Sequence, residues 1–150
     1  MAQTVAMKAW TAAGAAAFFV WLALTLAAQG QEAYKVRLSP VPADQKTRPD
    51  LSGSGALTAT LSGAKLSING SFEGLKAPAT SAELRSGVMA GVRGPVIATL
   101  TITKATSGMI SGSADLTPQQ LANLRKNGLY VQIYSEKTQA EGVLWGWLLK

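Results

Sequence analysis

The 150-residue chain contains no cysteine and no histidine. Without Cys there is no disulfide framework and no thiolate chemistry, and without His the commonest metal ligand and the commonest general base are absent. The Asp and Glu residues show no spacing typical of a metal site or a catalytic pair. We therefore expect a protein that is not an enzyme and that holds no metal and no cofactor of its own.

Charge is also sparse, because charged residues make up 15% of the chain against about 25% in a typical globular domain. The formal net charge is +6, but the basic residues are scattered singly, and a nucleic-acid surface needs a basic stripe with interleaved aromatics. The glycine-rich segment Ser86–Pro95 lacks the Gly-Lys-Ser/Thr ending of a phosphate loop. Nucleic acid is therefore not an expected partner.

The longest uncharged apolar stretch runs from Ala9 to Ala28. As a helix it would span about 30 Å, enough for the hydrocarbon core of a bilayer. One interpretation is a signal peptide cleaved after Gly30. The other is an uncleaved anchor, which we favour because the stretch is longer than a typical signal-peptide core and carries bulky Phe18, Phe19 and Trp21.

Small residues recur within this stretch at Ala9, Ala13 and Ala17, with Gly14 beside them, a pattern that suits close helix packing in a membrane. The anchor predicts a single-pass protein of a bacterial inner membrane with its C-terminal domain in the periplasm. The signal peptide predicts a soluble periplasmic or secreted protein. The expected organisation is an anchor or signal peptide over 1–30, a linker over 31–55 and a domain over 56–150.

The linker prediction rests on the proline- and glycine-rich composition that follows a short expected strand over 33–38. Beyond it, short alternating strands separated by Gly and Pro favour an antiparallel sandwich or barrel. Thr117 followed by Pro118 predicts a helix start, and Gly128 predicts its end. The expected strands cover 56–62, 65–72, 80–85, 96–103, 109–114, 129–134 and 143–149.

The last two expected strands carry an excess of aromatics. Leu129, Val131 and Ile133, with Leu144, Gly146 and Leu148, alternate with a second set that is also apolar, and one of the two sets must face the core. If the strands pair antiparallel, Gln132 lies near Trp145 and Tyr130 near Trp147. A solvated face should not be so aromatic, which predicts an interface. The predicted interface residues are Tyr130, Gln132, Tyr134, Val143, Trp145 and Trp147.

Three other interpretations of this face stay open. The N-terminal segment or the linker would cover it, it would serve as an aromatic platform for carbohydrate, or Trp145, Trp147 and Leu149 would lie at a membrane interface, where Trp is enriched. Lys150 directly after them fits the third interpretation.

From about Gly53 to Leu149 the chain resembles the chordin-type (CHRD) domain. The matching segments are GSFEGLKAPATSAEL, GVRGPVIATL, ISGSADLTPQQLANLRKNGLYVQIY and GVLWGWL. The resemblance implies an all-β fold, a Greek-key-like antiparallel β-sandwich of the kind seen in copper–zinc superoxide dismutases, with one short helix and without that activity.

The chain departs from the family pattern at the positions where the resemblance implies a site. The family places a His-x-His pair where this chain has Glu83 and Arg85, and a further His where it has Tyr134. The closing strand Glu-Ile-Arg-Gly-Gln-Leu corresponds to 143–148, where the polar residues become Val, Trp and Trp. We therefore expect any metal or polar site of the family to be lost.

These observations predict a non-catalytic accessory subunit of a bacterial membrane complex of electron-transfer type, a photosynthetic reaction-centre and light-harvesting assembly or a respiratory complex, by analogy of architecture. Its partners would be the other subunits and the membrane, with lipids or pigments as further contacts of the N-terminal helix. The alternative is a soluble periplasmic module that binds a glycan or a protein.

Overall fold

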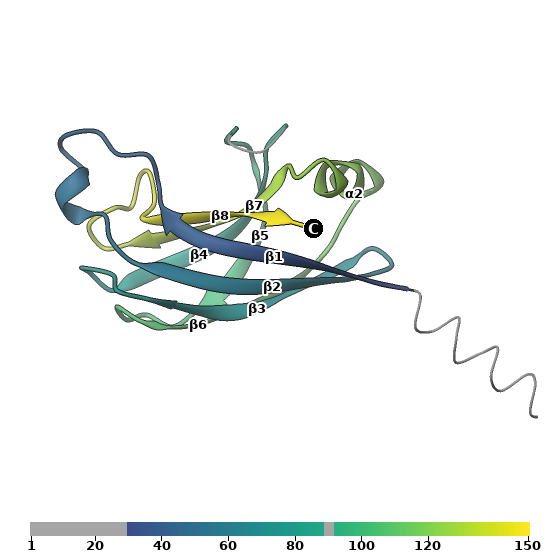
Figure 1. Cartoon of the computed structure of the whole chain (residues 1–150), viewed down its shortest axis with the longest axis horizontal. Coiled ribbons are helices and arrows are strands. Elements are labelled where there is room, and N and C mark those ends of the chain that lie inside the picture. The colour runs from purple at the N-terminus through teal and green to yellow at the C-terminus, as the bar shows by residue number, and fades with distance from the viewer. Residues whose placement is uncertain (1–29, 89–91) are drawn as a thin grey trace, which may run out of the picture. The chain divides into compact units, whose positions relative to one another are not determined.

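The computed structural model describes residues 30–88 and 92–150 (Figure 1). The predicted anchor or signal peptide and its small residues Ala9, Ala13, Gly14 and Ala17 lie outside the described residues. Within the described ranges, no helix is long and apolar enough to cross a membrane. The elements in chain order are β1 (Gln31–Pro40), η1 (Arg48–Asp50), β2 (Ser54–Ser62), β3 (Lys65–Glu73), β4 (Ala79–Ser86), β5 (Val96–Ile102), β6 (Gly108–Asp115), α2 (Pro118–Arg125), β7 (Leu129–Ser135) and β8 (Leu144–Leu149).

The strands form a closed antiparallel barrel in the order β1-β2-β3-β6-β5-β4-β7-β8. The predicted β-sandwich is therefore wrong, although the all-β class with one short helix is correct. Closure depends on the pairing of β1 with β8, which runs from Lys35 opposite Leu149 to Pro40 opposite Leu144. A closed barrel has no sheet edge left to pair with another chain, whereas a sandwich keeps several.

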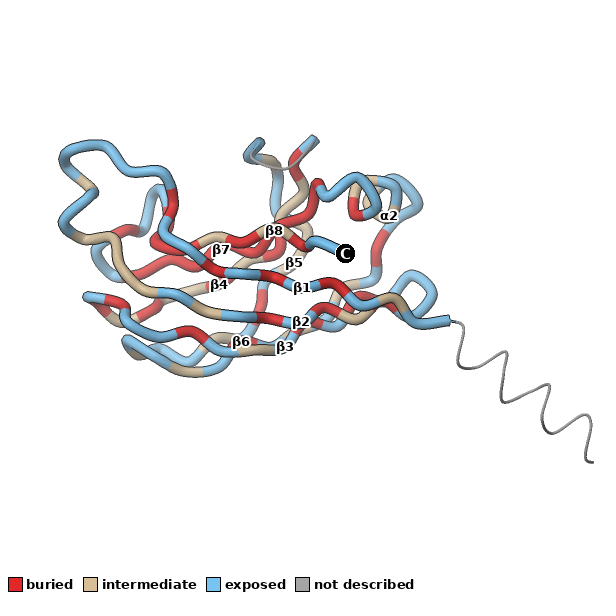
Figure 2. Tube along the Cα trace, in the orientation of Figure 1, coloured by how far each residue is buried: buried red, intermediate tan, exposed pale blue. Residues whose placement is uncertain are grey.

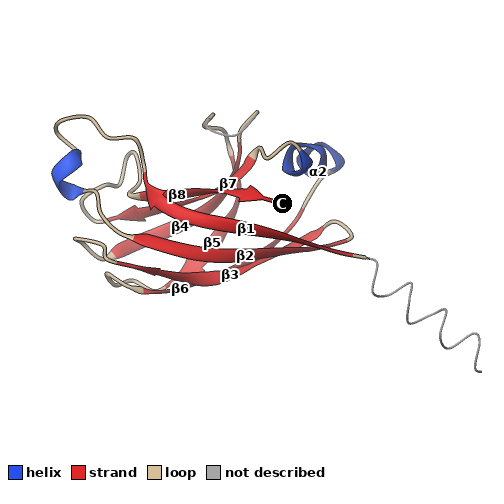
Figure 3. Cartoon of the chain, viewed as in Figure 1, coloured by secondary structure: helices blue, strands red, loops and turns tan. Residues whose placement is uncertain are grey.

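The first strand explains why the sequence missed this closure. β1 extends beyond the short strand expected over 33–38, and Tyr34, Val36 and Leu38 point into the core while their neighbours are exposed (Figure 2). The linker prediction for 31–55 is thus wrong for its first ten residues, because they belong to the barrel wall. What remains of the predicted linker contains η1 and the start of β2 (Figure 3).

The core is the barrel interior, filled by the inward half of each alternating strand. Leu57, Ile68 and Leu84 are examples at 3% exposure or less. At Gly146 of β8 the wall is too close for a side chain, because a Cβ there would lie 2.6 Å from the carbonyl oxygen of Arg37 on β1. Glycine is therefore the residue that lets β8 and β1 close the barrel.

Helix α2 confirms the helix predicted at Thr117. The Thr117 hydroxyl accepts a hydrogen bond from the Gln120 backbone N–H, and the Gln120 side chain accepts one from the Thr117 N–H, which completes a capping box. Leu124 is buried against the barrel. The helix ends one turn before the predicted Gly128, because Asn127 adopts a positive φ of 59°.

The start of β1 holds a buried phenol. The Tyr34 hydroxyl donates a 2.8 Å hydrogen bond to Glu32 Oε2, and Lys150 Nζ lies 3.6 Å from the same oxygen. Burial and the hydrogen bond to Glu32 raise the pKa of Tyr34 to about 12. The protonated phenol is therefore the form that the folded barrel favours.

This raised pKa predicts a loss of stability in alkali. An unfolded Tyr ionises near pH 10 while folded Tyr34 stays protonated, so its contribution is complete below pH 10 and is lost as pH rises toward 12. The free energy of unfolding should fall by up to about 2.7 kcal/mol over that window, measured by urea unfolding at a series of pH values. Tyr34→Phe should remove this part of the decrease, and an identical pH dependence in both proteins would contradict the assignment.

Candidate functional site

Strand β7 is buried along its whole length (Figure 2). The sequence predicted its second face as an interface and left open that the chain itself covers this face. Tyr130, Gln132, Tyr134 and the neighbouring Val143 are all buried within the chain. The predicted strand pairing is confirmed, with Tyr130 opposite Trp147 and Gln132 opposite Trp145. Trp145 and Trp147 of β8 are half-buried.

Two loops of the chain itself cover this face. In the loop before β5, the Gly94 backbone N–H donates a 3.0 Å hydrogen bond to the Tyr130 hydroxyl. In the loop after β7, the Glu141 carbonyl oxygen accepts a 2.7 Å hydrogen bond from Gln132 Nε2. The sequence pointed to the linker or the N-terminal segment as a cover, but these contacts come from the loops after β4 and β7.

The half-exposed rings of Trp145 and Trp147 pack against each other and against the buried ring of Tyr130. Tyr130 and Trp147 have ring centroids 4.4 Å apart, and Trp145 and Trp147 are 5.7 Å apart with planes at 67°, close to edge-to-face. Arg93 lies over the Trp145 ring with its Cζ 5.7 Å from the centroid, within cation–π range. The rings are therefore held in place by the fold.

Exposed residues extend this cluster into a surface. Leu149 follows Trp147 on the outer side of β8 and is 48% exposed, and Lys35 is its neighbour on β1. We call Lys35, Arg93, Trp145, Trp147 and Leu149 the aromatic–basic face. Sequence reasoning found its two Trp residues but missed Arg93, because nothing in a glycine-rich segment indicates which ring its side chain will cover.

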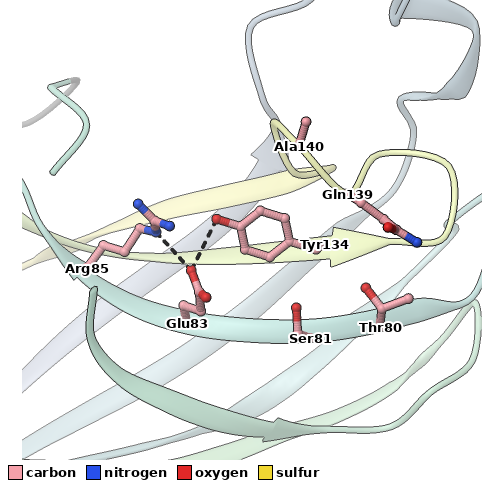
Figure 4. Close-up of a pocket in the computed structure, with 7 residues that line it drawn as sticks. All are labelled: Thr80, Ser81, Glu83, Arg85, Tyr134, Gln139 and Ala140. Atoms are coloured by element: carbon pink, nitrogen blue, oxygen red, sulfur yellow. Dashed lines mark hydrogen bonds and ion pairs between the residues drawn. The ribbon is translucent and has the colours of Figure 1, made fainter. Parts of the chain in front are cut away.

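A second feature is a polar hollow of about 500 Å³ beside β4 and β7 (Figure 4). Arg85 Nε donates a 2.9 Å hydrogen bond to Glu83 Oε2, and the Tyr134 hydroxyl donates a 3.1 Å bond to the same oxygen. Arg85 Nη1 also donates to the Gly94 carbonyl oxygen at 2.9 Å. We call this hollow the polar pocket; it is lined by Thr80, Ser81, Glu83, Arg85, Tyr134, Gln139 and Ala140.

The electrostatics of the pocket hold its groups in fixed protonation states. Burial raises the pKa of the Tyr134 phenol, and the nearby Glu83 carboxylate raises it further. Burial opposes the charge on Arg85, but the hydrogen bond to Glu83 together with the charge interactions with Tyr134, Glu83 and Tyr130 outweighs it, so the pKa of Arg85 is raised. Near neutral pH the pocket therefore holds a guanidinium and a neutral phenol beside the Glu83 carboxylate.

The arrangement does not suit a metal ion. Among the described residues, no group of three His, Cys, Asp or Glu side chains converges on a point. The pocket lining includes one carboxylate, and Arg85 and Tyr134 both donate to it. A metal would have to displace both donors and would meet a guanidinium beside it.

The polar pocket lies where the resemblance implied histidines. Arg85, two residues from Glu83 on β4, and Tyr134, on the distant strand β7, both donate to the same carboxylate oxygen of Glu83. The loss of the family's own histidine site stays a prediction, and a different set of polar groups meets at these positions. Thr80, Ser81 and Gln139 also line the pocket, and the sequence carried no signal for them beyond the strand alternation.

The eight antiparallel strands, closed by the pairing of β1 with β8, form a small all-β barrel domain. The CHRD domain family model matches residues 26–146, and the chain belongs to this family. The match begins before β1, well ahead of the predicted start at Gly53, which agrees with β1 being part of the domain. No curated protein and no solved structure matches the chain.

Proposed function

We propose that the protein is a non-catalytic accessory subunit of a bacterial membrane protein complex, of photosynthetic or respiratory electron-transfer type. The apolar segment 9–28 anchors it in the inner membrane. The barrel lies in the periplasm and docks on the other subunits through the aromatic–basic face. Lipids or pigments are further contacts of the N-terminal helix.

The observation that carries the proposal is the half-exposed, ordered aromatic cluster. Trp145 and Trp147 are fixed by contacts with each other and with Tyr130, so little side-chain entropy is lost when a partner covers them. Trp, Tyr and Arg are the residue types that dominate protein interfaces. Lys35 and Arg93 add positive charge at the margin, which favours a partner with an acidic rim.

The docking face can be tested without disturbing the core, because Arg93 and Leu149 are exposed. The variant with Arg93→Glu and Leu149→Asp should be lost from the membrane complex during purification in mild detergent, while the wild-type protein stays bound. Binding should weaken by at least about tenfold, since a reversed charge and a buried carboxylate both oppose the contact.

Met109→Asp on β6 is the matched control, because Met109 is an apolar side chain with 57% exposure on a different strand. This variant should stay in the complex. If wild-type protein runs alone while the membrane complexes remain intact, or if Met109→Asp dissociates as readily as the double variant, the proposal fails.

The alternative is a soluble periplasmic binding module released by cleavage after Gly30. The intact mass of the native protein distinguishes the two proposals. A mass that starts at Gln31 favours the soluble module, and a mass that includes residues 1–30 favours the anchored subunit.

A further inference from the structure

We propose that the polar pocket is a binding site for a neutral carbohydrate. The site is separate from the aromatic–basic face and goes beyond the docking function. It is built by β4, β7 and the loop that follows β7, with Thr80, Ser81, Glu83, Arg85, Tyr134 and Gln139 around one hollow (Figure 4). The hollow is large enough for one or two sugar rings.

The charge of the pocket selects a neutral ligand. Glu83 and Arg85 form a 2.9 Å ion pair with side chains that are 23% and 25% exposed, so one positive and one negative charge cancel within the site. An anion would be attracted by Arg85 but repelled by Glu83, and a cation would be attracted by Glu83 but repelled by Arg85. A ligand without net charge avoids both penalties.

The geometry of Arg85 also argues against a carboxylate or phosphate ligand. Two-pronged recognition of such groups uses two parallel N–H donors of one guanidinium. The Nε donor is already bound to Glu83 and an Nη1 donor to the Gly94 carbonyl oxygen. This excludes the side-on pair that uses Nε, and the N–H groups that remain on Nη1 and Nη2 can each donate a single hydrogen bond to a hydroxyl oxygen.

The pocket offers acceptors beside these donors. Both hydrogen bonds to Glu83 end on Oε2, so within the described residues Oε1 is left to accept a hydrogen bond. The hydroxyls of Thr80 and Ser81 and the amide of Gln139 can each donate and accept. Neighbouring hydroxyls of a sugar ring need this mixture, because each hydroxyl donates one hydrogen bond and accepts others.

Tyr134 supplies the apolar part of the site. In Figure 4 its ring lies across the pocket, with its hydroxyl turned toward Glu83 and Arg85. The ring is held by the hydrogen bond to Glu83, and at 9% exposure it forms a small apolar part of the pocket wall. The pocket is shallow, so the expected dissociation constant for a short oligosaccharide is on the order of 1 mM.

The test is a titration of the isotope-labelled full chain, in mild detergent, with cellotriose, maltotriose and triacetylchitotriose. At least one of these should produce saturable NMR shifts centred on Thr80, Ser81 and Gln139. Gln139→Ala should weaken that binding about fivefold, because it removes one exposed amide that hydrogen-bonds the sugar without touching the core. Thr58→Ala, on the outer side of β2, is the control and should bind as wild type.

Glu83→Gln provides a second readout that a merely structural role would not give. The variant removes the negative charge that balances Arg85. It should therefore bind the neutral trisaccharide about tenfold more weakly and should gain affinity for trigalacturonate. The proposal is overturned if none of the three neutral trisaccharides gives saturable shifts up to about 20 mM. It is also overturned if the wild-type protein prefers trigalacturonate, or if both pocket variants bind the trisaccharide as the wild-type protein does. Arg93→Glu with Leu149→Asp should leave the titration unchanged, which separates this result from the docking proposal.

Discussion

Replacing Gly146 by alanine should prevent the barrel from closing properly and lower the free energy of unfolding by about 3 kcal/mol. The new Cβ would lie 2.6 Å from the Arg37 carbonyl oxygen and 2.7 Å from a methyl group of Val36. The oxygen belongs to the backbone of β1, so relief requires the two strands to separate. Urea unfolding followed by tryptophan fluorescence measures the effect, because Trp145 and Trp147 flank the position.

Gly30→Ala is the matched control, since a Cβ at Gly30 meets nothing within 4 Å. It should unfold at the wild-type urea concentration. A Gly146→Ala protein as stable as this control would show that β8 and β1 do not approach as closely as described.

Tyr130→Ala should cost the barrel about 3–5 kcal/mol, the range found when a buried aromatic is truncated. The Tyr130 ring is fully buried and packs on Trp147 at 4.4 Å. Its removal leaves a void beneath Trp147 and takes the acceptor from the Gly94 N–H. Urea unfolding gives the loss of stability, and near-ultraviolet circular dichroism should show a weakened tryptophan signal.

Tyr130→Phe separates the ring from its hydroxyl. It should cost only about 1 kcal/mol, the usual contribution of one hydrogen bond, and keep the near-ultraviolet signal. If Tyr130→Ala were no less stable than Tyr130→Phe, the ring would not be part of the packed structure.

The strands and the helix could be predicted because their signals are local. The alternation in β2 and β3 and the Thr117–Gln120 capping box each depend on residues a few positions apart. Barrel closure could not be predicted, because β1 is followed by a proline- and glycine-rich segment that suggested a linker. The alternation of residues indicates that β1 has two faces, but it does not predict which strand will lie beside β1.

The site was predicted only in part for a related reason. Periodicity placed Tyr130, Tyr134, Trp145 and Trp147 on one side of the β7–β8 hairpin, and the register confirms the pair of Tyr130 with Trp147. Whether that side meets solvent depends on loops with no periodic pattern, such as the one whose Glu141 carbonyl oxygen binds Gln132. The convergence of Glu83 and Tyr134 likewise depends on the pairing of β4 with β7, two strands separated by three other elements.

The pairing of Lys35 with Leu149 has a consequence for how the chain folds. These residues lie near opposite ends of the described chain, so one edge of β1 stays unpaired until β8 has been made. Bringing such distant segments together carries a large loop-closure entropy and makes this step slow. During synthesis one edge of β1 therefore keeps unpaired backbone groups. Premature termination before β8 would leave that edge free to pair with another chain.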